Sequence, residues 1–280
     1  MARRAGQLAA NIPPLPRPSR THVYKPPIYI ISLAGAEDRR SFMREQLAKL
    51  DVRHEFFDAV HGARQPDHPL FSRYNDIKRA ERRGANASLR PAQLGCFASH
   101  YLLWEKCVAL KHAIIVLEDD AILLPSFAAF HAKAHEFAQR YGLVWLQPSR
   151  KVLNQAGHHL EQIGHFTVKK FAKGFSGTTG YLITPTTAQA LLTYSSEWLY
   201  PVDNTMDRFY DHKVEAIGID PFCVTQDDDF ESTINIPDNG TRHSLSDKAH
   251  REWANLKDTW KRQRHNLAFR ITARMGRRGR

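Results

Sequence analysis

Three consecutive carboxylates, Glu118, Asp119 and Asp120, follow directly on the apolar run of residues 114–117. A continuous β-branched run is typical of a strand buried on both faces, and ligands in α/β sheets bind at the carboxyl ends of such strands. Crowded carboxylates repel each other unless a cation joins them, and hard divalent ions such as Mg2+ and Mn2+ prefer oxygen ligands. The pattern therefore indicates a metal site, although the same acids could begin a solvated turn or cap the next helix.

The elements before the acids must deliver them to the edge of a sheet. Residues 28–33 predict a first strand, residues 42–50 predict a helix with one apolar face, and residues 54–60 predict a second strand. Strand, helix and strand in this order form a βαβ unit with parallel strands. Residues 62–89 lack clean periodicity, so we expect a long, partly basic loop there.

A helix beginning at Pro91 is expected to lead into the acidic strand, because proline suits a first helical turn and apolar residues recur at helical spacing up to Val108. Further strands are predicted over residues 143–146 and 181–183. Thr184 and Pro185 then suit the first positions of another helix. The fold class predicted is α/β, with a mostly parallel central sheet flanked by helices.

The formal net charge of +11 comes from the ends of the 280-residue chain. Residues 1–25 carry +5 and residues 251–280 carry +8, which leaves the stretch between them nearly balanced at −2. This distribution argues against a nucleic-acid partner. Residues 1–27 are rich in proline, so we expect a poorly ordered leader there. The catalytic domain is expected over residues 28–245. Residues 246–280 are expected to form a basic, amphipathic helix or tail.

The cysteines and the apolar runs bear on the compartment. Three widely spaced cysteines argue against a disulfide framework and favour a reducing environment. No stretch reaches the roughly 18 apolar residues that span a bilayer, and the N-terminus has no apolar signal core. We expect a cytoplasmic protein, at most peripheral on the cytoplasmic face of the inner membrane.

Six short pieces of the sequence, taken in their order and spacing along the chain, point to a known family. They are residues 28–33 with Asp38-Arg39-Arg40, Gly95-Cys96-Phe97-Ala98-Ser99-His100 with Trp104, Leu117-Glu118-Asp119-Asp120, Gly180-Tyr181-Leu182-Ile183, Pro201-Val202-Asp203, and Gln226 followed by Ser232-Thr233-Ile234. Together they resemble glycosyltransferase family 25, the family of lipooligosaccharide galactosyltransferases and related enzymes. The likeness covers roughly residues 28–236.

The resemblance implies a GT-A-like fold with a Rossmann-like nucleotide-binding half, a UDP-sugar donor and a divalent metal, Mn2+ or Mg2+. It also implies an inverting transfer of a hexose, with galactose as the family's common donor, to a hydroxyl of a cell-surface glycan or glycolipid such as lipopolysaccharide. The usual metal motif is Asp-x-Asp, and Glu118, Asp119 and Asp120 match its position. Residues two apart on a strand share a side, so we expect Asp120 to contact the metal and Glu118 to support it or reach the ribose. Asp119 is the alternative if the chain turns there.

By the same resemblance, the first strand ends at the nucleotide. Ser32 and Leu33 would then lie near the base and ribose. Arg39 or Arg40 could pair with phosphate or with a motif carboxylate, because guanidinium groups bind planar oxyanions through two hydrogen bonds. Both arginines could equally lie on a solvated helix face.

Three further residues come from the matching pieces. Gly180 would let the backbone approach the donor sugar closely, although glycine-rich turns are commonly just turns. His100 could hydrogen-bond a sugar hydroxyl or the motif acids, whereas a lone histidine in an apolar helix is more often structural. Gln226 is placed near the site by the resemblance alone.

An inverting transferase also needs a carboxylate that takes the proton from the acceptor hydroxyl. Asp203 lies in a matching piece and is the preferred base. Asp207 and the acidic cluster of residues 227–229 are the alternatives, and that cluster could equally be a solvated loop.

The C-terminal segment carries its own pattern. Apolar residues recur at helical spacing among lysines and arginines, namely Trp253, Leu256, Trp260, Leu267 and Ile271. Such a helix suits the surface of an anionic membrane, with apolar side chains on one side and cations on the other. A packed C-terminal helix with a solvated basic face is the equal alternative.

Two other functions remain open from the sequence. A non-enzymatic nucleic-acid-binding protein would use the basic ends and lose affinity steeply with salt. A glycoside hydrolase would use paired carboxylates without nucleotide or metal.

Overall fold

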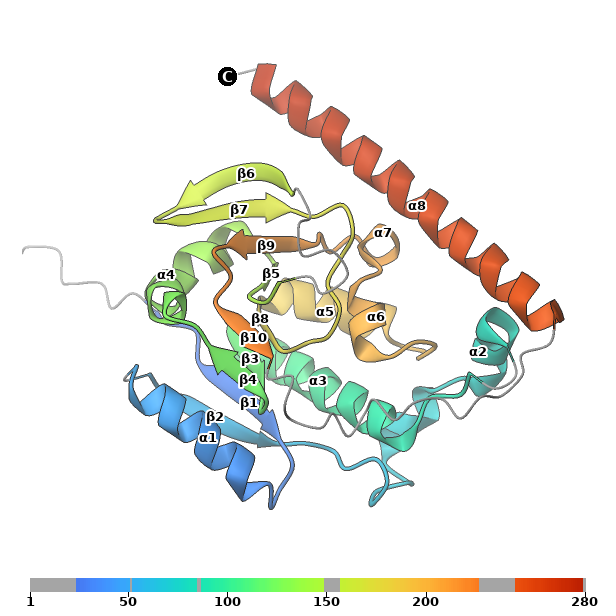
Figure 1. The fold of residues 1–280 in the computed structure, drawn as a ribbon, viewed down its shortest axis with the longest axis horizontal. Coiled ribbons are helices and arrows are strands. Elements are labelled where there is room, and N and C mark those ends of the chain that lie inside the picture. Colours follow the sequence, from blue (N-terminus) through green and yellow to red (C-terminus); the bar gives the residue numbers. More distant parts are fainter. Residues whose placement is uncertain (1–23, 51, 85–86, 149–156, 227–244, 279–280) are drawn as a thin grey trace, which may run out of the picture.

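A computed structural model describes residues 24–50, 52–84, 87–148, 157–226 and 245–278. Its centre is an eight-stranded sheet with helices on both faces and a small two-stranded sheet beside it (Figure 1). In spatial order the eight strands are β2 (His54–Asp58), β1 (Ile28–Ser32), β3 (Ile114–Glu118), β8 (Gly180–Ile183), β5 (Leu143–Trp145), β9 (Ile217–Asp220), β7 (Phe166–Lys170) and β6 (His158–Ile163). The small sheet pairs β4 (Ala121–Leu123) with β10 (Val224–Gln226).

Helices cover both faces of this sheet, and further helices lie at the periphery of the domain. In chain order they are α1 (Glu37–Ala48), the 3-10 helix η1 (Pro69–Arg73), α2 (Asp76–Arg83), α3 (Pro91–Leu110), α4 (Ser126–Arg140), α5 (Pro185–Tyr194), α6 (Val202–Met206), α7 (Phe209–His212) and α8 (Leu245–Arg278). Ile28 and Ile30 of β1 share a buried core with α1 and α4, whereas Tyr29 and Ile31 share the opposite core with α3 and α5. Burial on both faces explains the continuous apolar runs of β1 and β3.

The expectation of an α/β protein is confirmed, but the expectation of a mostly parallel sheet is wrong. β1 runs parallel to β2 and β3, as the βαβ unit predicts. β8 is antiparallel to both of its neighbours, β3 and β5, and β7 is antiparallel to β6 and β9, so the sheet is mixed. Parallel neighbours require a long crossover, whereas β6 and β7 are joined by a tight turn at Gly164, which makes this pair antiparallel.

The predicted loop over residues 62–89 is also wrong, because η1 and α2 lie within it. The side chain of Asn75 caps α2 by accepting a hydrogen bond from the backbone N of Lys78 at 2.9 Å. None of the α2 side chains is buried. The helix therefore lacks the apolar periodicity by which a sequence pattern would reveal it.

The helix predicted to precede the acidic strand is confirmed as α3, which begins at Pro91. It ends at Lys111, whose backbone is left-handed with φ of 58°. The start of α5 is also as expected, with Thr184 at the N-cap position and Pro185 in the first turn. Both helices pack against the face of the sheet that carries Ile114 and Val116 of β3.

The C-terminal helix α8 is 34 residues long and lies along the outside of the domain, against α2 and α7 (Figure 1). Within the described ranges, no helix combines the length and the apolar character needed to cross a membrane. Cys96, Cys107 and Cys223 are all free thiols, in agreement with the expectation of no disulfide framework.

Candidate active site

The three acids lie where β3 ends and the chain turns into β4. Glu118 is the last residue of β3, Asp119 and Asp120 form the turn, and β4 begins at Ala121. β10 pairs with β4 and places Gln226 opposite Ala121. Each acid has a different set of partners, and these partners come from distant parts of the chain.

Glu118 is held from two sides. Nε2 of His100 lies 3.2 Å from its Oε1, and the Thr178 hydroxyl donates a hydrogen bond to the same oxygen. Thr178 is 3% exposed and belongs to the loop that precedes β8. No role was expected for Thr178 from the sequence, so this contact was missed.

A buried hydrogen-bond relay orients His100. The Trp104 indole donates to the Tyr181 hydroxyl at 3.0 Å, and that hydroxyl lies 2.9 Å from Nδ1 of His100. If the hydroxyl proton points at Nδ1, the proton on the ring is at Nε2 and donates to Glu118, so every group in the relay is satisfied. All three relay side chains are buried, which fixes the orientation of the imidazole.

The glycine at the start of the Gly95–His100 piece allows α3 to approach the sheet edge. A Cβ on Gly95 would lie 2.4 Å from the carbonyl oxygen of Val60, so only glycine fits. The Ser99 hydroxyl accepts from the backbone N of Val60 at 2.9 Å and donates to the carbonyl of Gly95 at 2.8 Å. These contacts lock the helix turn that carries His100.

The two arginines after the first strand have different roles. Nη1 of Arg39 donates to Oδ1 of Asp119 at 2.9 Å, so Arg39 contacts a motif carboxylate. Arg40 donates to the carbonyl of Ser32 at 3.2 Å and to the Asp58 carboxylate. Arg39 therefore joins α1 to the acidic turn, and Arg40 braces the carboxyl ends of β1 and β2.

Asp120 is buried, and only one of its two carboxylate oxygens has a hydrogen-bond partner among the described residues. Gln226 Nε2 donates to its Oδ2 at 2.8 Å, but its Oδ1 is buried and has no hydrogen-bond partner among the described residues. Burial, followed by the nearby Glu118 charge, raises the pKa of Asp120 to about 7. An orphaned carboxylate oxygen beside a second carboxylate fits a hard divalent cation.

A second group of possible ligands lies close by but suits a cation less well. Cys96, His100 and Glu118 offer ligand atoms that all lie within 4.8 Å of one another. Both ring nitrogens of His100 are already engaged in hydrogen bonds. Burial raises the pKa of the Cys96 thiol well above its usual value, and a protonated thiol is a poor metal ligand.

Asp203 lies on the same side as the acidic turn. The adjacent loop residues Gly177 and Thr178 contact Asp203 and Glu118 respectively, which places the two carboxylates beside the same loop. Asp203 stands in the first turn of α6 and accepts hydrogen bonds from the backbone N of Gly177 at 3.3 Å and from the side chain of Asn204 at 3.1 Å. The loop of residues 174–180 thus contacts Asp203 and, through Thr178, Glu118.

Gly180 is the first residue of β8 and lies tightly against its neighbours. A Cβ there would lie 3.0 Å from a Leu117 methyl group. Its backbone N donates to Gln147 at 2.9 Å, and Gln147 in turn donates to the carbonyl of Ser176 at 2.9 Å. Gln147, which sequence reasoning missed, therefore shapes the loop on which Asp203 rests.

A pocket of about 380 Å³ opens at the carboxyl ends of β1 and β2. It is lined by Leu33, Ala34, Asp58, Ala59, Val60, His61, Arg64 and Gln65. Ser32 is buried next to this rim, and its hydroxyl has no partner among the described residues. Leu33 thus lines the pocket, whereas Ser32, the residue before it, is buried and is not part of the lining.

The alternative bases have different surroundings. Asp207 accepts from Arg262 of α8 at 3.2 Å, and a Cβ on Gly174 would lie 1.3 Å from its Oδ1. Asp207 therefore links α8 to the loop of residues 174–180. The acidic cluster of residues 227–229 lies outside the described residues.

The molecule is an α/β protein whose carboxylates lie at the end of a strand, the edge of the sheet at which ligands bind in many α/β proteins. The family model for "Glycosyltransferase family 25 (LPS biosynthesis protein)" matches residues 25–206, well over half of the chain. The chain therefore belongs to glycosyltransferase family 25. This finding confirms the resemblance to the family, and the matched range contains five of the six sequence pieces, all but that of Gln226 with residues 232–234.

Individual relatives agree with the family. A glycosyltransferase 25 family member of Aedes aegypti is 35% identical over 185 residues, which are 63% of this chain and 29% of that protein. The lipooligosaccharide biosynthesis protein lic2B of Haemophilus influenzae is 32% identical over 96 residues, 34% of each chain. A putative glycosyltransferase of Haemophilus influenzae is 24% identical over 251 residues, 82% of this chain and 84% of that one.

The extent of these matches is uneven. The chain spans about a third of the length of the first three relatives that it matches. Other relatives, a human protein among them, are named inactive glycosyltransferase 25 family members. Family membership by itself therefore leaves the activity to be argued from the site.

Proposed function

We propose that the chain is a metal-dependent glycosyltransferase that moves a hexose from a UDP-sugar to a hydroxyl of a cell-surface glycan or glycolipid. The observation that carries the proposal is Oδ1 of Asp120, which is buried without a described partner near Glu118 at the end of β3. Asp120 and Glu118 are the residues that would hold a Mn2+ or Mg2+ ion. Such an ion neutralises the charge that develops on a departing diphosphate.

The remaining residues at this edge suit the nucleotide half of the donor. The pocket lined by Leu33 is within the size range of small-molecule sites, and it opens beside the acidic turn because β1 and β3 are neighbours. Arg39, which contacts Asp119, places a guanidinium cation at this edge, and guanidinium groups suit the oxygens of a diphosphate. The Ser32 hydroxyl is suited to a ribose hydroxyl. This arrangement supports the proposal of a GT-A-like nucleotide-binding half.

Asp203 is proposed as the base of an inverting transfer. The acceptor hydroxyl gives its proton to the Asp203 carboxylate while its oxygen attacks the anomeric carbon and the UDP group leaves. Hydrogen bonds from Gly177 and Asn204 fix the orientation of this carboxylate. The same loop reaches Glu118 through Thr178, so one segment contacts both the proposed base and one of the two proposed metal ligands.

The acceptor and donor are proposed from the family. One relative is named for lipooligosaccharide biosynthesis, which favours a bacterial surface glycolipid as acceptor. Galactose is the hexose proposed, and the cytoplasmic face of the inner membrane is the proposed place of action.

The test is a screen of UDP-sugars with Mn2+ and a lipooligosaccharide acceptor, with release of UDP as the measurement. We expect release with one hexose donor, loss of release in EDTA, and recovery when Mn2+ is added back. Release that persists in EDTA and in Asp120→Asn would overturn the metal assignment. Absence of release with every donor would overturn the transferase proposal, and salt-sensitive nucleic-acid binding or sugar release without UDP would favour the two alternatives.

A further inference from the structure

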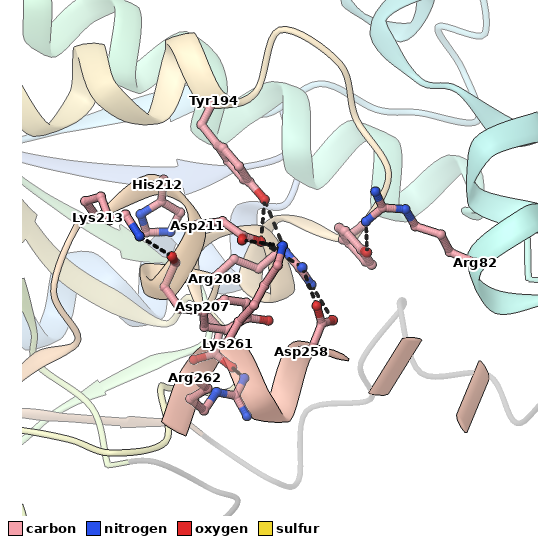
Figure 2. Close-up of polar contacts among 12 residues, drawn as sticks. Arg82, Tyr194, Asp207, Arg208, Asp211, His212, Lys213, Asp258, Lys261 and Arg262 are labelled. Atoms are coloured by element: carbon pink, nitrogen blue, oxygen red, sulfur yellow. Dashed lines mark hydrogen bonds and ion pairs between the residues drawn. The ribbon is translucent and has the colours of Figure 1, made fainter. Parts of the chain in front are cut away.

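The C-terminal helix α8 is fixed to the domain mainly by polar contacts, together with one aromatic contact between Phe269 and the ring of His158. Arg208 donates to both oxygens of Asp258, at 2.7 and 2.6 Å, and Lys261 lies 2.9 Å from Asp211 (Figure 2). Arg262 lies 3.2 Å from Asp207. Further along the helix, His265 contacts Glu215 and Asn266 contacts the carbonyl of Ala172. These contacts define the inner face of α8.

The opposite side of the helix is apolar and exposed. It consists of Trp253, Leu256, Trp260, Leu267 and Ile271, which are between 46% and 61% exposed and which we call the outer stripe. At about 100° per residue, these five positions fall within about 60° of the helix circumference, on the side nearly opposite to Asp258, Arg262 and His265. The usual amphipathic arrangement is thus inverted, since polar residues face the domain and apolar residues face outward.

Cations accompany the outer stripe. Nζ of Lys257 lies 5.4 Å from the ring centre of Trp253, and the guanidinium of Arg264 lies 5.3 Å from that of Trp260. Among the described side chains of α8, the acids are Glu252 and Asp258, and Asp258 is engaged by Arg208 on the inner face. The outward side therefore combines aromatic and aliphatic groups with positive charge.

We propose that the outer stripe docks on an anionic lipid bilayer, with α8 lying parallel to the membrane surface. Tryptophan rings and aliphatic side chains enter the boundary between headgroups and acyl chains, and Lys257 and Arg264 pair with anionic headgroups. The stripe is about 27 Å long at 1.5 Å per residue, so one helix face presents it to a flat surface. The inner-face ion pairs hold the helix in the orientation that keeps the stripe outward.

A second copy of the chain and a nucleic acid fit this surface less well. Two stripes packed together would bring Lys257 and Arg264 of both copies into one interface, where like charges repel. A phosphate backbone would satisfy the cations but would leave five exposed apolar side chains unburied. An anionic bilayer both buries the apolar side chains and pairs with the cations.

The test uses the full chain in co-sedimentation with vesicles of phosphatidylcholine, with or without about one third phosphatidylglycerol. We expect strong partitioning only with the anionic lipid. The double variant Trp253→Ser, Trp260→Ser should weaken partitioning by about tenfold or more. Ile77→Ser is the matched control, because Ile77 is 76% exposed on α2 and lies outside the stripe, and it should partition as the unmodified chain does.

A second pair of variants tests the charges. Lys257→Gln with Arg264→Gln should weaken binding to the anionic vesicles by about fivefold for each cation removed, whereas Arg53→Gln at an exposed site away from α8 should have no effect. Far-UV circular dichroism and the melting temperature should match the unmodified chain, since the substituted side chains are exposed. Equal partitioning of the tryptophan variant and the unmodified chain would overturn the proposal.

A dimer held by the stripe would also overturn it. Light scattering would then show a dimer that becomes a monomer in the tryptophan variant, without vesicle binding. Release of UDP with a water-soluble acceptor should be unchanged in the tryptophan variant, so failure of lipid docking and failure of the proposed transfer are distinguishable.

Discussion

Nε2 of His100 lies 3.2 Å from Oε1 of Glu118, so a fully buried histidine on α3 contacts the carboxylate that ends β3. The other ring nitrogen contacts Tyr181 on β8, the neighbouring strand. The imidazole therefore joins one helix to two strands at the point where the acids emerge. We infer that it positions Glu118 rather than touching the substrate.

Replacement of His100 tests this positioning role. His100→Gln should lower the rate of UDP release by about 10- to 100-fold and weaken Mn2+ binding, because Glu118 loses a donor that orients it. Tyr181→Phe should have a smaller effect of the same kind, since only the orienting hydroxyl is removed. Calorimetric titration with Mn2+ gives the affinity. His131→Gln, at a buried histidine on α4, is the control and should lower the melting temperature without changing Mn2+ affinity.

Asp120→Asn should abolish the rise in melting temperature that Mn2+ produces in the unmodified protein, because the neutral amide replaces the proposed ligand. Without metal, the variant should be at least as stable as the unmodified chain, since its repulsion with Glu118 is gone. The raised pKa of Asp120, about 7, also predicts that Mn2+ affinity falls as the pH drops below 7, because protons compete with the metal. A pH-independent affinity would contradict this.

Asp203→Asn should leave the Mn2+-induced rise in melting temperature intact and reduce transfer by about 100-fold or more, because the amide cannot take the acceptor proton. Transfer to a labelled acceptor and thermal shift, measured on the same preparation, separate the two effects. A variant that transfers normally but no longer responds to Mn2+ would show that Asp203 belongs to the metal site.

Arg208→Ala should lower the free energy of unfolding by about 3 kcal/mol, because it leaves Asp258 partly buried without its cation and leaves Asp211 with Lys261 alone. Asp258→Asn should cost less, about 1–2 kcal/mol, since Arg208 keeps Asp211. Urea unfolding measures both. Lys78→Ala removes the exposed contact with Glu197 and should change stability little, so an equal loss in this control would contradict the importance of the buried pair.

His212 makes stability depend on pH. Burial lowers its pKa from 6.5 to about 4, so between these values the unfolded chain binds a proton that the folded chain does not. This contribution to stability is fully present above pH 6.5 and is lost as the pH falls towards 4, by up to about 3 kcal/mol. His212→Gln should reduce the stability difference between neutral and acidic buffer, measured by urea unfolding, whereas His159→Gln at an exposed site should not.

The first half of the fold was predictable because its signals are local. The strands β1 and β3 are buried on both faces, which their continuous apolar runs predict. The helix α3 starts at a proline, a residue that suits the first turn of a helix. α2 escaped prediction because none of its side chains is buried. The antiparallel placement of β8 depends on the route of the chain through the preceding hairpin, which strand patterns do not contain.

The sequence by itself determined the chemistry of the candidate site, since three carboxylates after an apolar strand specify a cluster of acids at a sheet edge. Only the tertiary structure decided the partner of each acid. Arg39 is 80 residues from Asp119, Thr178 is 60 from Glu118, and Gln226 is 106 from Asp120. The physical reason is that hydrogen bonds and burial depend on distance in space, whereas residue spacing reveals only neighbours along one helix or strand.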